Sequence, residues 1–318
     1  MHSIGTPGLW AAFTLVVLAA LAVDFLALRS KGPRRVSFRQ AIRWSVVWIA
    51  LALVFNAGLW WWLDAHAGGA VANRVALEFL TGYVVEKSLA VDNIFVFLMV
   101  FNYFAVPAEL RQRVLMLGVL GAIVLRAILI FIGAALVAEF HWILYLFGVF
   151  LLVTGIKMLI GANQEPDLDN NPILRWMRNH LPLTQRFRDG ALSIVENGKR
   201  CYTPLFVVMV LIAVTDVIFA VDSIPAIFAV TEDPFVVLTS NVFAVLGLRA
   251  LFFLLEGMAA RFHLLSYGLA AVLMLIGTKM LIAGWWKMPI GIALGLVALL
   301  IGASMLASLW IKPRERGA

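Results

Sequence analysis

The chain has 318 residues, of which 63% are hydrophobic and 14% are charged, and its mean hydropathy is +0.97. A soluble domain is roughly 45–50% apolar and about 25% charged, so this chain has too few charged side chains to cover a soluble surface. The composition excludes an ordinary cytosolic enzyme, a disordered chain and, with a single cysteine, a disulfide-rich secreted module. It predicts a polytopic membrane protein. The net charge of +7 is then a property of its loops, not of a nucleic-acid interface.

Apolar runs long enough to cross a bilayer, roughly 20 residues each, follow one another along the chain. They predict an all-α fold with about nine transmembrane helices. In chain order the predicted spans are residues 9–28, 41–63, 76–102, 113–138, 142–161, 204–230, 235–257, 264–286 and 289–311. The first run is longer than the core of a signal peptide and is followed, not preceded, by basic residues, so we expect it to remain as a helix.

Basic residues gather on one side of these predicted spans. The connections after the first, third, fifth, seventh and ninth spans hold 18 of the 25 Lys and Arg residues, and the opposite side holds Arg74 and Lys287. Because basic loops stay in the cytoplasm, we expect the N-terminus outside the cell and the C-terminus in the cytoplasm. The long polar connection, residues 162–203, is then a cytoplasmic linker, with a short amphipathic helix expected near residues 173–180.

Short segments of the first half of the chain recur in the same order in the second half. Glu86–Asp92 recurs as Asp216–Asp222, Leu125-Arg126-Ala127 as Leu248-Arg249-Ala250, Phe140-His141 as Phe262-His263, and Gly155–Met158 as Gly277–Met280. The repeated unit holds three predicted spans, and an odd number of spans places the second copy upside down in the membrane. The sequence therefore predicts two inverted three-helix repeats, an architecture typical of secondary transporters.

The repeat divides the chain into five predicted parts. Residues 1–75 supply two helices outside the repeat, 76–161 the first repeat, 162–203 the linker, 204–286 the second repeat, and 287–318 a last helix with a basic cytoplasmic tail.

Four acidic residues well inside the third and sixth predicted spans are the candidate metal ligands: Glu86, Asp92, Asp216 and Asp222. A charge inside the bilayer costs at least about 2.5–3.5 kcal/mol, so such residues mark functional pathways. Glu86 and Asp216 fall near the centres of antiparallel helices, and we expect them to form a central pair, with Asp92 toward the cytoplasm and Asp222 toward the outside.

Neutral side chains could add oxygen ligands to this site: Asn93, Ser223 and Asn241. The alternative interpretation is that the acids only pair with the basic residues of the same spans, which are Lys87, Arg126 and Arg249. Oxygen ligands without thiolates or paired histidines favour Mn²⁺, Mg²⁺ or Ca²⁺ over Cu(I) or Zn²⁺.

The segments Glu86-Lys87-Ser88-Leu89-Ala90-Val91-Asp92-Asn93 and Phe219–Thr231 resemble the TerC family of bacterial inner-membrane proteins, and its Alx branch in particular. The likeness extends over essentially the whole chain. It implies a nine-helix protein of the bacterial inner membrane that exports manganese, in a family named for tellurium resistance. It would also assign the metal pathway to the four acids named above.

The function predicted from these observations is a secondary transporter that exports Mn²⁺ from the cytoplasm, coupled to proton entry. Its partners would be the metal ion, protons and the lipid bilayer, without nucleic acid, enzymatic activity or a permanently bound cofactor. No phosphate-binding GxxxxGK[ST] motif occurs, so ATP is not an expected energy source. Two alternatives stay open: a membrane scaffold of a stress or tellurium-resistance complex, and an intramembrane aspartyl protease, for which the GxGD motif is missing.

Overall fold

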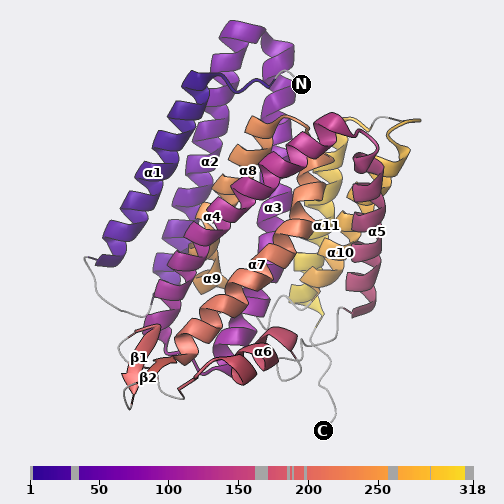
Figure 1. Cartoon of the computed structure of the whole chain (residues 1–318). Coiled ribbons are helices and arrows are strands. Elements are labelled where there is room, and N and C mark those ends of the chain that lie inside the picture. The colour runs from indigo at the N-terminus through magenta and orange to yellow at the C-terminus, as the bar shows by residue number, and fades with distance from the viewer. Residues whose placement is uncertain are drawn as a thin grey trace.

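The computed structural model describes residues 3–29, 36–161, 171–184, 187, 190–196, 199–256, 264–286 and 288–311. Within these residues the chain is nearly all-helical (Figure 1). The helices are α1 (Pro7–Arg29), α2 (Phe38–Ala67), α3 (Gly69–Tyr103), α4 (Ala108–Glu139), α5 (Ile143–Gly161), α6 (Pro172–His180), α7 (Pro204–Phe228), α8 (Pro234–Leu246), α9 (Leu248–Glu256), α10 (Leu265–Ile282) and α11 (Ile290–Trp310). Two strands, β1 (Ser193–Glu196) and β2 (Lys199–Tyr202), pair antiparallel.

Seven of the described helices are long and apolar enough to cross a membrane: α1, α2, α4, α5, α7, α10 and α11. Helices α8 and α9 pass the same test together, as a pair bent by 41° around Gly247, and make an eighth candidate. Helix α3 has 35 residues, but its charged side chains, which include Glu86, Lys87 and Asp92, exclude it from this apolar set. The described residues thus form a polytopic membrane protein with seven or eight such helices, where the sequence predicted nine.

Local sequence explains where several helices begin. The Ser37 hydroxyl accepts a hydrogen bond from the Gln40 amide at the start of α2, and the Asp233 carboxylate accepts one from the Phe235 amide at the start of α8. Pro204 and Pro234 stand at the first positions of α7 and α8, where a missing N–H costs nothing. The two caps and the two prolines mark where α2, α7 and α8 begin, and of these helices α7 carries the buried Asp216.

The described part of the predicted linker contains more structure than the sequence indicated. Helix α6 forms where an amphipathic helix was expected, with Leu174 and Met177 buried. The hairpin of β1 and β2 was not predicted, because strands of four residues are too short for alternation to reveal them. Both elements lie at the lower end of the bundle in Figure 1.

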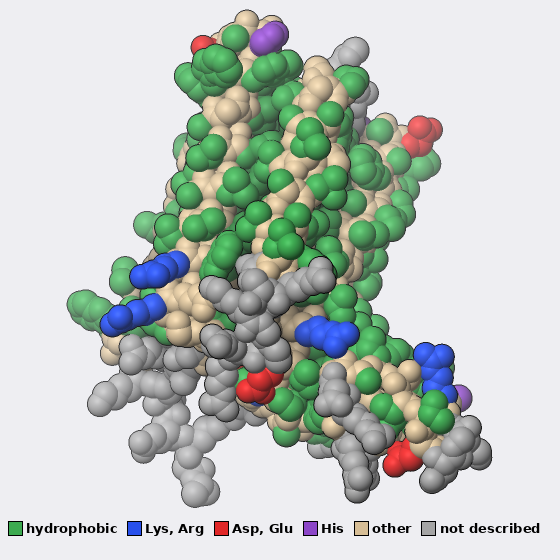
Figure 2. Space-filling model, turned by 90° about the vertical axis from the view of Figure 1, so that its left-hand side faces the viewer, with side chains coloured by type: hydrophobic (Ala, Val, Ile, Leu, Met, Phe, Trp, Pro, Cys, Tyr) green, Lys and Arg blue, Asp and Glu red, His purple; other side chains and the backbone are tan. Residues whose placement is uncertain are grey.

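The outer surface of the bundle is apolar along its length. Figure 2 shows hydrophobic side chains over the helices, with the visible Lys and Arg side chains in the lower half of the molecule. Large side chains such as Leu15 and Val54 are each 68% exposed, which is expected for a surface that faces lipid. Helix α8 has the opposite character, because every residue from Phe235 to Leu246 is buried.

Helices α5 and α10, which the predicted repeat relates to each other, pack backbone to backbone. A Cβ atom added at Gly155 would lie 2.9 Å from the Ala270 oxygen and 3.0 Å from the Met274 nitrogen. One added at Gly277 would lie 2.7 Å from the Gly148 oxygen and 2.8 Å from the Leu152 nitrogen.

These two sets of contacts are equivalent under the predicted repeat. The sequence match that pairs Gly155 with Gly277 also pairs Gly148 with Ala270 and Leu152 with Met274. Each glycine therefore meets the repeat-related copy of the other glycine's neighbours. Two repeats related by a two-fold axis would make reciprocal contacts of this kind. The close approach itself is possible because glycine has no side chain to separate the helices.

We expect Gly277→Val and Gly155→Val each to destabilise the protein by about 1–3 kcal/mol, the usual cost of overpacking. Both variants would force α5 and α10 apart. Thermal unfolding of the purified protein in detergent measures the effect. Gly295→Val in α11 is the matched control, because nothing lies within 4 Å of a Cβ at that position; equal stability of all three variants would contradict the close packing.

Candidate functional site

A buried cluster of three charged residues lies where α3, α4 and α7 meet. The Arg126 guanidinium of α4 forms an ion pair with Glu86 of α3, and its second terminal nitrogen lies 3.4 Å from Oδ1 of Asp216 in α7. It also donates a hydrogen bond of 3.3 Å to the Ser223 hydroxyl. The side chains of Arg126, Glu86 and Asp216 are 1%, 0% and 12% exposed, so the cluster is shielded from both solvent and lipid.

The helical spacing of the sequence turns these side chains inward. Arg126 is four residues from Ala122 and four from Ile130, which are buried on the same face of α4. Asp216 is likewise four residues from Ile212 and from Ala220 on the buried face of α7. Each charge is thus fixed on a helix face that packing already directs into the bundle.

The cluster carries an excess of one negative charge, because two carboxylates share one guanidinium. Three of its polar atoms are buried without a hydrogen-bond partner among the described residues: Glu86 Oε2, Asp216 Oδ2 and Arg126 Nε. Buried polar atoms are usually satisfied, and each exception calls for an explanation such as a water or an ion. Two unpartnered carboxylate oxygens beside a net negative charge have the chemistry of a cation site.

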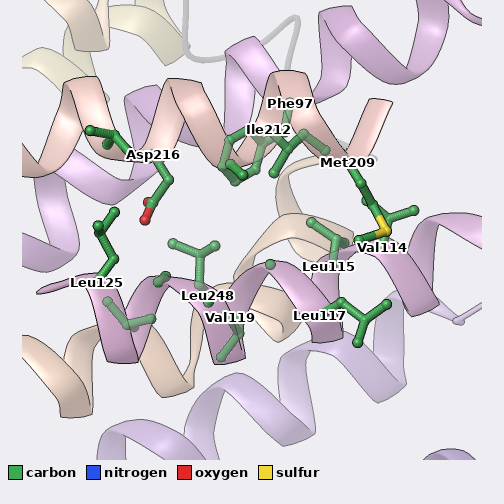
Figure 3. Close-up of a pocket in the computed structure, with 16 residues that line it drawn as sticks. Phe97, Val114, Leu115, Leu117, Val119, Leu125, Met209, Ile212, Asp216 and Leu248 are labelled. Atoms are coloured by element: carbon green, nitrogen blue, oxygen red, sulfur yellow. The ribbon is translucent and has the colours of Figure 1, made fainter. Parts of the chain in front are cut away.

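A cavity of about 260 Å³ adjoins this cluster. It lies between α4 and α7, and Asp216 is the one charged residue in its lining. Figure 3 shows the Asp216 carboxylate directed into this space, with Val114 and Met209 at the opposite end, near the beginnings of α4 and α7. The cavity therefore extends from the lower end of these two helices to the buried acid.

The other predicted oxygen ligands are distributed unevenly. Ser223 contacts Arg126, whereas Asn93 is buried in α3 and Asn241 in α8. Neither amide atom of Asn241 has a hydrogen-bond partner among the described residues, which leaves a second unsatisfied polar group in the core. Asp222 is partly buried on α7, and no ion pair or hydrogen bond joins it to another described residue.

The side chain of Asp92 lies outside the described residues, although its backbone belongs to α3. Within the part of the chain that the structure describes, no three His, Cys, Asp or Glu side chains are close enough together to hold a metal ion. The structure brings Glu86 and Asp216 to a common partner and does not bring Asp222 to them.

Of the three predicted charge partners, Arg126 alone contacts a predicted acid whose side chain the structure describes. The Lys87 ammonium instead donates a hydrogen bond of 3.1 Å to the Ala244 carbonyl oxygen. Arg249 forms a buried ion pair with Asp24 of α1, an acid that was not among the predicted site residues. The sequence could have indicated Asp24 as a buried charge, because this residue also lies inside an apolar run.

Comparison with known proteins agrees with the membrane-protein character of the chain. The sequence profile of the TerC family, described as an integral membrane protein family, matches residues 71–316. The chain belongs to the TerC family. No solved structure matches the chain.

Curated relatives are similar to this TerC protein over nearly their whole length. Alx of Escherichia coli K12, named provisionally as a membrane-bound redox modulator, is 51% identical over 315 residues, which cover 99% of this chain and 98% of that protein. An uncharacterized membrane protein of Myxococcus xanthus is 47% identical over 98% of this chain and 95% of its own. A membrane protein of Rickettsia felis is 36% identical, with 94% and 97% covered.

The ion pair of Asp24 and Arg249 generates a prediction about stability. We expect Asp24→Asn to cost about 3–5 kcal/mol, because it leaves the buried Arg249 charge uncompensated. The double variant Asp24→Asn/Arg249→Gln should recover most of that loss, since no unpaired charge remains. Thermal unfolding of the single and double variants measures the coupling; strictly additive losses would contradict it.

Proposed function

We propose that this TerC protein is a secondary transporter that exports a divalent cation, Mn²⁺ in the first place, from the bacterial cytoplasm. The observation that supports the proposal most is the pair of buried carboxylates, Glu86 and Asp216, each with one oxygen that accepts no hydrogen bond from the described residues. Carboxylate, hydroxyl and amide oxygens suit Mn²⁺, Mg²⁺ and Ca²⁺. Asp222 and Asp92 are then the outer acids of the same pathway, on α7 and α3.

The architecture that the proposal needs has nine spans and two inverted repeats. Helix α3 would be one of the nine spans, although its charged residues exclude it from the set of apolar helices. The bent α8–α9 pair would together form another of the nine. The reciprocal glycine contacts of α5 and α10 support the repeat. With basic residues on the cytoplasmic side, the N-terminus would lie outside the inner membrane and the C-terminus inside.

Export against a negative-inside membrane potential requires an energy source. Moving two charges outward costs about 4.6 kcal/mol per 100 mV, at about 2.3 kcal/mol for each charge. We propose that proton entry supplies this work, because protons and metal ions compete for the same carboxylates. Mn²⁺ efflux from proteoliposomes that is unaffected by an imposed pH gradient would contradict this coupling.

Two other functions can be distinguished from transport by measuring the metal content of cells. A scaffold of a stress or tellurium-resistance complex would not depend on the buried acids for metal content. The provisional name of Alx suggests a redox role, but the single Cys201 leaves no thiol pair within one chain. Neither alternative accounts for unpartnered carboxylate oxygens in the core.

We expect overexpression of the wild-type protein to lower cellular manganese several-fold, and expect Glu86→Gln and Asp216→Asn to abolish this effect. Each variant removes one anionic ligand while keeping side-chain size. Asp64→Asn is the matched control, because Asp64 is exposed near the end of α2. Elemental analysis of washed cells gives the metal content, and immunoblotting of membranes gives the amount of protein.

A manganese content that is unchanged by the wild type would contradict the transport proposal. So would export that survives both substitutions at wild-type level. A loss of export in all three variants would show that the effect is not specific to the buried acids.

A further inference from the structure

Arg126 occupies the position of a cation between the two acids of the proposed site. Its guanidinium lies between carboxylates from two different helices, α3 and α7, while Arg126 itself belongs to α4. The arginine is 1% exposed. An arginine held in this way supplies the positive charge that a bound metal ion would otherwise supply.

Arg126 contacts one oxygen of each of the two carboxylates. It contacts Oε1 of Glu86 and Oδ1 of Asp216, whereas Oε2 and Oδ2 have no hydrogen-bond partner among the described residues. A metal ion that binds these carboxylates therefore meets two buried oxygens that accept no hydrogen bond from the described residues, and one competing cation. Arginine does not lose its proton in proteins, so the competition can be relieved only by movement of the guanidinium, not by its neutralisation.

We propose that Arg126 is a tethered counter-cation, which holds Glu86 and Asp216 in the metal-free carrier and yields them to the metal ion. This inference rests on the proposed function, because it assigns a role within the same site. The physical reason is charge balance. Without Arg126, the metal-free carrier would hold two unpaired carboxylates in its core, and an unpaired buried charge is strongly unfavourable.

The proposal has a consequence for the transport cycle. After releasing the metal ion, the carrier must return metal-free, and two buried carboxylates resist that return unless both of their charges are balanced. Arg126 would balance one of them, and the entering proton of the proposed exchange would balance the other. Removal of the Arg126 charge should therefore impair the return of the metal-free carrier more than the movement of the metal-loaded one.

The ion pair of Arg249 and Asp24 provides the matched control. Arg249 occupies the repeat-related position, is also buried, and among the described residues pairs with Asp24. A purely structural role for buried arginines would give similar results at both positions, whereas a counter-cation role is confined to Arg126.

The first test measures Mn²⁺ binding to the purified full-length protein at about pH 8 by equilibrium dialysis. We expect Arg126→Gln to bind Mn²⁺ about tenfold more tightly than the wild type, because a competing charge is gone. Arg126→Lys, which keeps a charge but not the two-armed geometry, should bind several-fold more tightly. The double variant Asp24→Asn/Arg249→Gln, which leaves no buried carboxylate unpaired, should bind as the wild type does.

The second test compares two modes of transport in proteoliposomes, net Mn²⁺ efflux and exchange of labelled for unlabelled Mn²⁺. We expect Arg126→Gln to lose net efflux at least tenfold relative to exchange, and Arg126→Lys to retain both. The ratio of the two rates does not depend on the amount of active protein, so partial misfolding does not obscure it. Asp24→Asn/Arg249→Gln should leave this ratio unchanged.

The outcomes separate the inference from the function on which it rests. If the wild type neither transports nor exchanges Mn²⁺, the proposed function is wrong. If the wild type is active but both Arg126 variants bind Mn²⁺ no more tightly than it does, Arg126 is not a competing cation. An unchanged ratio of net efflux to exchange in Arg126→Gln would equally overturn the inference. Should Arg126→Gln fail to fold, Arg126→Lys decides by its binding affinity.

Discussion

The buried ion pairing of Arg126 with Glu86 and Asp216 ties three helices together in the core of this protein. It joins α3, α4 and α7 at a point shielded from solvent and lipid. Two carboxylates and one guanidinium leave a net negative charge, and a buried charge of this kind is costly unless something compensates it. The excess of one carboxylate makes the cluster less stabilising for the fold, and it also allows the cluster to bind a cation.

The helices around the cluster are arranged so that it can sit in the core. Apolar stripes on α4 and α7 turn Arg126 and Asp216 inward, and the buried α8 packs against α3 and α4. Away from the cluster, α5 and α10 form a close contact through glycines, and Asp24 joins α1 to Arg249. A cavity with apolar walls extends from the beginnings of α4 and α7 to Asp216. The cluster of Arg126, Glu86 and Asp216 is thus a place in the core where charged groups of the two predicted repeats meet.

The sequence indicated the membrane class, most of the helices and the central pair of acids, because these depend on apolar run length and on charges that interrupt it. It could not indicate that one arginine contacts both acids, since that depends on how α3, α4 and α7 rotate and pack. Arg249 was misleading for the same reason: its partner Asp24 comes from α1, which lies outside the repeat. The bend between α8 and α9 could not be predicted, because no proline marks it in the sequence. Strands β1 and β2 are too short to be recognised from sequence alternation.

The most direct test of a cation site at Glu86 and Asp216 is electron paramagnetic resonance of Mn²⁺ added to the purified protein. The account predicts that the free-ion signal of Mn²⁺ is lost as a single ion binds each wild-type chain. It also predicts that the free-ion signal persists with the double variant Glu86→Gln/Asp216→Asn. Equal loss of the signal with wild type and double variant would contradict the account, because the ion would then be bound elsewhere.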